Sequence, residues 1–314
     1  MHASLALLLF LVPHLIAAVP TGFAPGISAR SSPSTAAVSQ DVVSSELTRP
    51  AFHARAVYCS TASVTALSCG APCQALQGVN VITAGGDGGE TPRFYIATDP
   101  SIQAVVVAHQ GTDPENLLSD ANDVEIAHVT MNTTLFPGAA KGVEVHDGFQ
   151  ATQGRTADLV LSTVKSALSS SGFKTVLVTG HSLGAAVAVL DATMLKMQLS
   201  SDISIKSVTF GQPRVGNQAF ANMVDSLLSG FVRVTNQHDI VPIVPPELLG
   251  YEQVSGEIHI TTVDSTTGVA TLVSCPGQEN SNCADSNSIL NVSIANHLGP
   301  YFNGISFGAA ACPA

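Results

Sequence analysis

The amino-acid sequence predicts an α/β fold with a central, mostly parallel sheet flanked by helices. Between residues 102 and 235, short apolar runs rich in β-branched residues alternate with longer helical segments, which is typical of a parallel sheet covered on both faces. With 314 residues, 45% of them hydrophobic, the chain is long enough for one large domain or two small ones. The expected strands are 79–83, 92–97, 102–109, 176–178, 205–210 and 230–235, and the main expected helices are 156–169, 185–199 and 218–228.

The charge balance narrows the classes of function. The formal net charge is −11, and only 12 residues are Lys or Arg. A strongly acidic chain repels nucleic acid and acidic substrates. We therefore expect an uncharged substrate and no nucleic-acid partner.

The N-terminal region has the composition of a targeting segment followed by a leader. Residues 4–19 are apolar but too short for a membrane span, and we interpret residues 1–18 as a secretory signal peptide, although no Lys or Arg precedes the apolar run. Residues 19–50, rich in Ser, Ala, Thr and Pro, are expected to form a flexible leader or propeptide. The folded domain is then expected to span residues 51–314, with no transmembrane segment.

Residues 174–199, KTVLVTGHSLGAAVAVLDATMLKMQL, carry the strongest motif. A buried strand runs into Gly-His-Ser-Leu-Gly, and a long helix follows without a break. A G-x-S-x-G motif at such a turn is a nucleophile elbow, in which the glycines let strand and helix approach closely and the serine hydroxyl points out of the sheet. Ser182 is therefore the candidate nucleophile, and the free N–H groups at the helix start, beginning with Leu183, are candidate oxyanion donors.

A serine nucleophile needs a base and an acid, which follow it in the order Ser, Asp, His in α/β-hydrolases. Asp239 comes just after the strand that ends at Thr235, at the edge where functional side chains emerge. Two histidines follow. His259 lies within an alternating, strand-like run, whereas His297 lies in a loop or helix edge near the chain end, so His297 is the candidate base.

Other polar residues near these motifs have structural interpretations. His181 neighbours the serine, but adjacent side chains at an elbow point apart, so we expect it to be buried and structural. Asp191 is expected to pack or to be solvated on the elbow helix. The pair His146 and Asp147 is expected to be structural or to line a pocket, because adjacent side chains diverge.

The six cysteines favour an oxidising destination. Six cysteines allow 15 pairings, so proximity alone does not decide among them. A zinc site at Cys69-x3-Cys73 lacks a second pair of ligands, and no metal is expected. Proximity in the sequence favours the disulfides Cys69–Cys73 and Cys275–Cys283, and Cys59 with Cys312 would then join the two ends of the folded domain.

Two glycosylation sequons begin at Asn132 and Asn291. They are meaningful only for a secreted chain, because N-glycosylation takes place in the secretory pathway. We expect both to carry glycans if the signal peptide interpretation holds.

Several motifs together resemble the fungal class 3 lipase family, which includes triacylglycerol lipases and feruloyl esterases. The resemblance covers the chain from about residue 55 to its end, with the motifs in the family's order. The matching segments are AHQGT at 108–112, VHDGF at 145–149, VTGHSLGAA at 178–186, TFGQPRVGN at 209–217, HDIVP at 238–242 and NHLGPYF at 296–302.

This resemblance implies roles for particular residues. Ser182, Asp239 and His297 match the family's triad, in agreement with the separate reasoning above, and the three cysteine pairs resemble its disulfides. Thr112 matches the oxyanion residue, whose N–H would act with that of Leu183. The family's lid helix would cover residues 113–122, starting at an Asp N-cap with Pro at its first position; its expected residues are Asp113, Pro114, Leu117, Leu118 and Ala121.

We therefore expect a secreted, monomeric serine hydrolase of the α/β-hydrolase fold that cleaves carboxylic esters, foremost acylglycerols, without a cofactor. Its partner would be an ester or lipid at an oil–water interface. The acidic, weakly apolar lid segment instead favours a feruloyl-type esterase or a short-chain carboxylesterase, while the apolar run 240–249 favours a fatty acyl chain. The alternative from another class is a non-catalytic binding protein on a hydrolase scaffold.

Overall fold

A computed structural model describes residues 33–112, 127–288 and 290–312. Within these ranges, nine strands form one sheet in the order β1-β13-β12-β10-β8-β7-β4-β3-β2. The five central strands, from β12 to β4, run parallel, and the pairs at both edges are antiparallel. The strands are β1 (Ala36–Val38), β2 (Asn80–Gly85), β3 (Phe94–Asp99), β4 (Ala104–His109), β7 (Thr175–His181), β8 (Ser204–Phe210), β10 (Phe231–Asn236), β12 (Glu257–Val263) and β13 (Ala270–Cys275).

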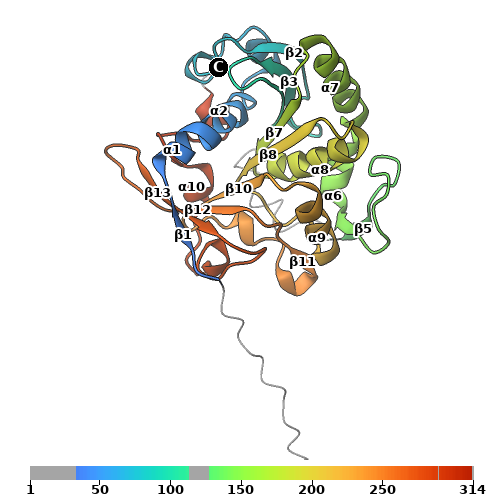
Figure 1. Ribbon diagram of the computed structural model, residues 1–314. Coiled ribbons are helices and arrows are strands. Elements are labelled where there is room, and N and C mark those ends of the chain that lie inside the picture. Colours follow the sequence, from blue (N-terminus) through green and yellow to red (C-terminus); the bar gives the residue numbers. More distant parts are fainter. Residues whose placement is uncertain (1–32, 113–126, 289, 313–314) are drawn as a thin grey trace, which may run out of the picture. The chain divides into compact units, whose positions relative to one another are not determined.

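Helices cover both faces of this sheet, as Figure 1 shows for α2 and α8. The longer helices are α2 (Thr48–Ala56), α6 (Asp147–Gly154), α7 (Ala157–Ser171), α8 (Leu183–Gln198) and α9 (Gln218–Leu227); the shorter ones are α1 (Gln40–Val42), α3 (Thr61–Thr65), α4 (Ala71–Gln74) and α10 (Ile294–Leu298). A second, antiparallel sheet has the order β11-β9-β6-β5, formed by Tyr251–Glu252, Gly216–Asn217, Glu144–His146 and His128–Thr130.

The alternation of side chains along the central strands divides the core into two layers. On β4, Val106 and Ala108 face the layer that contains α2, whereas Val105 and Val107 face the layer that contains α7 and α8. Strands buried on both faces need apolar residues at every position, which explains the continuous runs that predicted them. The expected α/β-hydrolase fold is confirmed.

The domain begins earlier than we expected. Residues 36–50, which we interpreted as part of a flexible leader, include β1, which pairs antiparallel with β13, and the start of α2. Figure 1 shows this first strand lying beside a strand from the end of the chain. Val43 and Leu47 are buried in the core. The expected boundary at residue 51 is therefore wrong. The segment has no visible periodicity in its sequence, but Val43 and Leu47 anchor it in the core.

Candidate active site

Ser182 occupies a strained turn between β7 and α8. Its backbone has φ 60° and ψ −130°, a conformation that non-glycine residues rarely adopt and that is typical of a nucleophile elbow. The two glycines that flank this turn, Gly180 and Gly184, have no room for a side chain. A Cβ on Gly180 would lie 2.2 Å from the carbonyl oxygen of Gly184, and one on Gly184 would lie 2.3 Å from that of His109.

Asp239 and His297 come together at the same edge of the sheet. His297 lies on the short helix α10, whose N-terminus is capped by the hydroxyl of Ser293. Its Nδ1 lies 2.9 Å from Oδ2 of Asp239, which follows β10, and Oδ1 of Asp239 accepts a hydrogen bond from the N–H of Val241 at 2.9 Å. The carboxylate can only accept, so Nδ1 carries a proton and Nε2 of the neutral ring is left as the base.

The serine and the histidine lie beside one another. The N–H of Ser182 donates to the carbonyl of Phe210 at 3.0 Å, and a Cβ on the next residue, Gly211, would lie 2.8 Å from Cε1 of His297. Oγ of Ser182 and Nε2 of His297 are both buried, and neither makes a hydrogen bond to any described residue. Neither of the two atoms that would exchange a proton is therefore engaged in another hydrogen bond with a described residue.

The turn after β4 packs directly on the elbow. A Cβ on Gly111 would lie 2.8 Å from Cβ of Ser182. The expected oxyanion residue, Thr112, is the next residue after Gly111. Leu183 is the first residue of α8, so its N–H has no acceptor within the helix. The expected lid residues Asp113, Pro114, Leu117, Leu118 and Ala121 lie outside the described residues.

His259, the other histidine that follows Asp239, is engaged elsewhere. It lies on β12, and its Nδ1 lies 2.8 Å from Oγ1 of Thr235. Burial lowers its pKa from the usual value of 6.5, although the nearby Glu257 opposes this shift. The structure therefore pairs Asp239 with His297 and gives His259 a place in a buried polar network.

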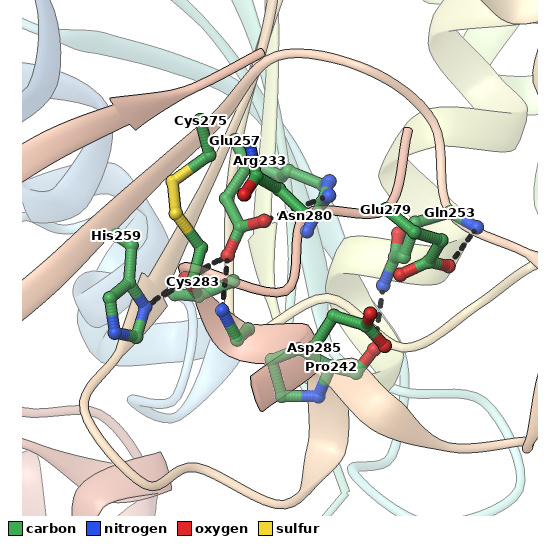
Figure 2. Close-up of polar contacts among 12 residues, drawn as sticks. Arg233, Pro242, Gln253, Glu257, His259, Cys275, Glu279, Asn280, Cys283 and Asp285 are labelled. Atoms are coloured by element: carbon green, nitrogen blue, oxygen red, sulfur yellow. Dashed lines mark hydrogen bonds and ion pairs between the residues drawn. A yellow bond between two sulfur atoms is a disulfide. The ribbon is translucent and has the colours of Figure 1, made fainter. Parts of the chain in front are cut away.

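Figure 2 shows part of that network, around Glu257 and the disulfide Cys275–Cys283. Its contacts extend to the segment that carries Asp239. Glu257 accepts hydrogen bonds from Arg233 at 3.1 Å, from the hydroxyl of Thr235 at 2.7 Å and from the N–H of Ala284 at 3.1 Å. The disulfide Cys275–Cys283 lies next to it and precedes Ala284. The chain then reaches Asn287, whose side-chain amide donates to the carbonyls of Gln237 and Asp239.

Arg214 also stabilises the loop that follows Asp239. This buried guanidinium donates to both carboxylate oxygens of Glu279, at 2.8 and 3.2 Å, and to the carbonyls of Ile243 and Pro245 in the loop after Asp239. Our reasoning from sequence missed Arg214 and Asn287. It also missed Asn236, whose side-chain amide donates to the carbonyls of Asn296 and Pro300 in the segment that carries His297. An arginine within the glycine- and proline-rich connection after a parallel strand was the available signal for Arg214, but nothing in the sequence identified its acceptors.

Of the four residues with structural interpretations, His181, Asp191 and His146 are buried, whereas Asp147 is exposed. His181 and Asp191 are fully engaged in hydrogen bonds, as described below. His146 accepts a hydrogen bond from the N–H of Phe149 at the start of α6, and the two rings lie 4.2 Å apart. Burial lowers the pKa of His146 to about 4, with Asp147 opposing the shift and His128 adding to it.

The cysteines form the three expected disulfides, Cys59–Cys312, Cys69–Cys73 and Cys275–Cys283. Their sulfur atoms are therefore not available as zinc ligands. One cluster of carboxylates among the described residues, Glu247, Glu279 and Asp285, surrounds the guanidinium of Arg214, which already supplies the positive charge that such a cluster attracts.

A serine in a strained strand-to-helix turn, beside a histidine held by an aspartate at the carboxyl edge of a parallel sheet, defines a serine hydrolase of the α/β-hydrolase fold. Comparisons with known proteins specify the family. Residues 106–249 match the model of the class 3 lipase family. The chain is 37% identical, over 67% of its length and 68% of the relative's, to a secreted mono- and diacylglycerol lipase of Malassezia restricta.

Another relative, from Malassezia globosa and also described as a secreted mono- and diacylglycerol lipase, is 33% identical over 73% of each chain. Among solved structures, the triacylglyceride lipase of Rhizomucor miehei superposes with a TM-score of 0.75 at 28% identity, covering 88% of this chain and all of that one. A lipase from Rhizopus microsporus var. chinensis gives 0.76 at 28% identity, covering 90% and 96%. The chain belongs to the class 3 lipase family.

Proposed function

We propose that this protein is a secreted lipase that hydrolyses the ester bonds of acylglycerols through Ser182, His297 and Asp239. The observation that carries the proposal is the contact of 2.9 Å between Nδ1 of His297 and Oδ2 of Asp239, together with the uncommitted Nε2 and the adjacent Ser182 hydroxyl. The names of its relatives support acylglycerols as substrates and secretion as its destination. None of the helices among the described residues is both long and apolar enough to span a membrane.

The proposed reaction has two stages. Oγ of Ser182 attacks the ester carbonyl as Nε2 of His297 takes its proton, and Asp239 stabilises the imidazolium. The N–H groups of Thr112 and Leu183 would hold the oxyanion; one such donor is typically worth about 10²–10³ in kcat. The imidazolium then protonates the departing alcohol, and water, activated by the same histidine, releases the fatty acid from the acyl-enzyme.

The test replaces the nucleophile. We expect Ser182→Ala to abolish hydrolysis of emulsified acylglycerols and labelling by a fluorescent alkyl phosphonate, with an unchanged circular dichroism spectrum. Retained activity in the purified variant would overturn the proposal, and failure of the native protein to react with the phosphonate would favour a non-catalytic binding protein.

Substrate class is tested on the native enzyme. Rates on dispersed triacylglycerol, diacylglycerol, monoacylglycerol and methyl ferulate should favour the acylglycerols, and the rate should rise when substrate exceeds its solubility and an interface forms. A preference for methyl ferulate or for dissolved short-chain esters, without a rise at the interface, would support the esterase alternative instead.

We also propose that the mature protein is a glycosylated monomer. Asn132 and Asn291 are both exposed, as modification requires. Mass spectrometry of the secreted chain before and after treatment with an endoglycosidase should show glycans at both asparagines and should locate the mature N-terminus. Light scattering should give the mass of one chain; a dimer would contradict the proposed state.

A further inference from the structure

A buried chain of hydrogen bonds links the turn after β4 to the backbone of the catalytic histidine. The N–H of Gly111 donates to the hydroxyl oxygen of Tyr58 at 3.1 Å. That hydroxyl lies 2.7 Å from Nδ1 of His181, and Nε2 of His181 lies 2.8 Å from the carbonyl oxygen of His297. One end of this hydrogen-bond chain is therefore Gly111, which packs against Ser182, and the other is the backbone of His297.

The direction of each hydrogen bond follows from the chemistry of the groups. A carbonyl only accepts, so Nε2 of His181 carries the proton. In the neutral ring Nδ1 must then accept, and the hydroxyl of Tyr58 donates to it while receiving the N–H of Gly111. Burial and the adjacent His297 keep the pKa of His181 well below 6.5, so the ring is neutral and the direction is unique.

The packing around His181 fixes the orientation of its imidazole ring. Its ring is stacked on Phe307, with centroids 4.5 Å apart, and lies 4.4 Å from the ring of His297. The hydroxyl of Tyr301 donates to the same carbonyl of His297 at 3.2 Å. We call the turn at Gly111 and Thr112 the oxyanion turn. Because Tyr58, His181 and Gly111 are all buried, none of these hydrogen bonds is exchanged readily for water.

We propose that Tyr58 is a positioning residue for ester hydrolysis: through Gly111 it holds the oxyanion turn against Ser182, and through His181 it holds the backbone of His297. Tyr58 has no direct part in bond making. This inference rests on the proposed function, because it assumes that the turn at Gly111 and Thr112 carries an oxyanion donor.

The structure supplies a matched control for removing the hydroxyl. Tyr95, on β3, is equally buried, and its hydroxyl lies 2.7 Å from Nδ1 of His53, whose Nε2 lies 2.9 Å from Oδ2 of Asp99. This is also a buried tyrosine–histidine pair, but no group of the triad belongs to it. Tyr58→Phe and Tyr95→Phe therefore remove the same atom from comparable surroundings.

The experiment measures kcat and KM for a soluble ester, and the inhibition constant of a trifluoromethyl ketone, which forms a tetrahedral oxyanion with the serine. We expect Tyr58→Phe to lower kcat about 10- to 100-fold, less than loss of a whole oxyanion donor, with KM changed less than threefold. Inhibitor affinity should fall by the same factor as kcat/KM. Tyr95→Phe should leave all three values within twofold of the native enzyme.

Equal effects of the two variants, or an unchanged inhibitor affinity in Tyr58→Phe, would overturn the inference. If Tyr58→Phe does not fold, nitrogen NMR of His181 in the native protein tests the inference instead. Nδ1 should show the shift of a hydrogen-bonded acceptor and Nε2 that of a protonated nitrogen from pH 5 to 8; titration in that range would refute the fixed direction. Activity that survives Ser182→Ala would instead refute the proposed function.

Discussion

Nε2 of His109 lies 2.8 Å from Oδ2 of Asp191, so a buried contact joins the end of β4 to the middle of α8. The other oxygen of Asp191 accepts a hydrogen bond from the side chain of Gln153 on α6, also at 2.8 Å. One carboxylate thereby connects three elements: the strand β4, which leads to the turn at Gly111 and Thr112, the helix α8, which begins at the elbow, and the helix α6. Asp191 is structural, as we expected, and is buried rather than solvated.

Replacing this carboxylate should destabilise the fold. Asp191→Ala leaves His109 and Gln153 without their acceptor, and we expect the free energy of unfolding to fall by about 1–3 kcal/mol. Asp191→Asn retains one carbonyl acceptor and should lose less. Urea denaturation of the three proteins measures the difference; an Ala variant as stable as the native protein would show that water replaces the carboxylate.

The elbow glycine Gly184 should not tolerate a side chain. Its Cβ would lie 2.3 Å from the carbonyl oxygen of His109, a backbone atom that cannot move without displacing β4. We expect Gly184→Ala to lower the free energy of unfolding by about 1–3 kcal/mol and to reduce activity sharply. Gly154→Ala is the control, because a Cβ there meets nothing within 4 Å and alanine favours the helix. Similar outcomes for both variants would contradict the steric argument.

His146 should make the protein sensitive to acid. Burial lowers its pKa to about 4 in the folded state, against 6.5 for an ordinary histidine. As pH falls below about 6.5, the unfolded chain takes up a proton that the folded protein does not, so stability is lost between pH 6.5 and 4. In His146→Asn, which retains an N-cap side chain, the free energy of unfolding should depend less on pH across this window. Parallel pH profiles for the two proteins would exclude this contribution.

Glu252 should have the opposite dependence on pH. Burial, reinforced by Glu279 and Glu247, raises the pKa of its carboxyl to about 7. The folded protein then keeps a proton that the unfolded chain has released, so stability falls as pH rises from about 4.5 through 7. Glu252→Gln removes this dependence, and we expect its melting temperature to exceed that of the native protein at pH 8 but not at pH 4.5. A native melting temperature equal to or above the variant's at pH 8 would be inconsistent with the raised pKa.

Short-range patterns were sufficient to predict four of the five central strands, the elbow and the helix after it. These features depend on residues close together in the chain: a β-branched run, two glycines four residues apart and an alanine-rich segment without Gly or Pro. The candidate acid followed from its place after a strand, because side chains at the carboxyl ends of parallel strands meet at one edge.

The start of the domain was not predictable in this way. β1 is three residues long and is stabilised by its pairing with β13, more than two hundred residues away. Nothing in the composition of a Ser- and Ala-rich segment indicates such a partner. Similarly, the acceptors of Arg214 are backbone carbonyls, which every residue has and which sequence therefore does not mark.

Only the tertiary structure decided which polar groups are hydrogen-bonded to other residues and which remain available to react. Asp239 and His297 are separated by 58 residues, and Tyr58 and His181 by 123. A hydrogen bond requires its two atoms to lie within about 3 Å, and whether distant residues meet that condition depends on the packing of every element between them. Residue types and order therefore limited the chemistry to a serine hydrolase and favoured His297 over His259 as the base, while the folded chain placed His297 against Asp239 and connected Tyr58 to the site.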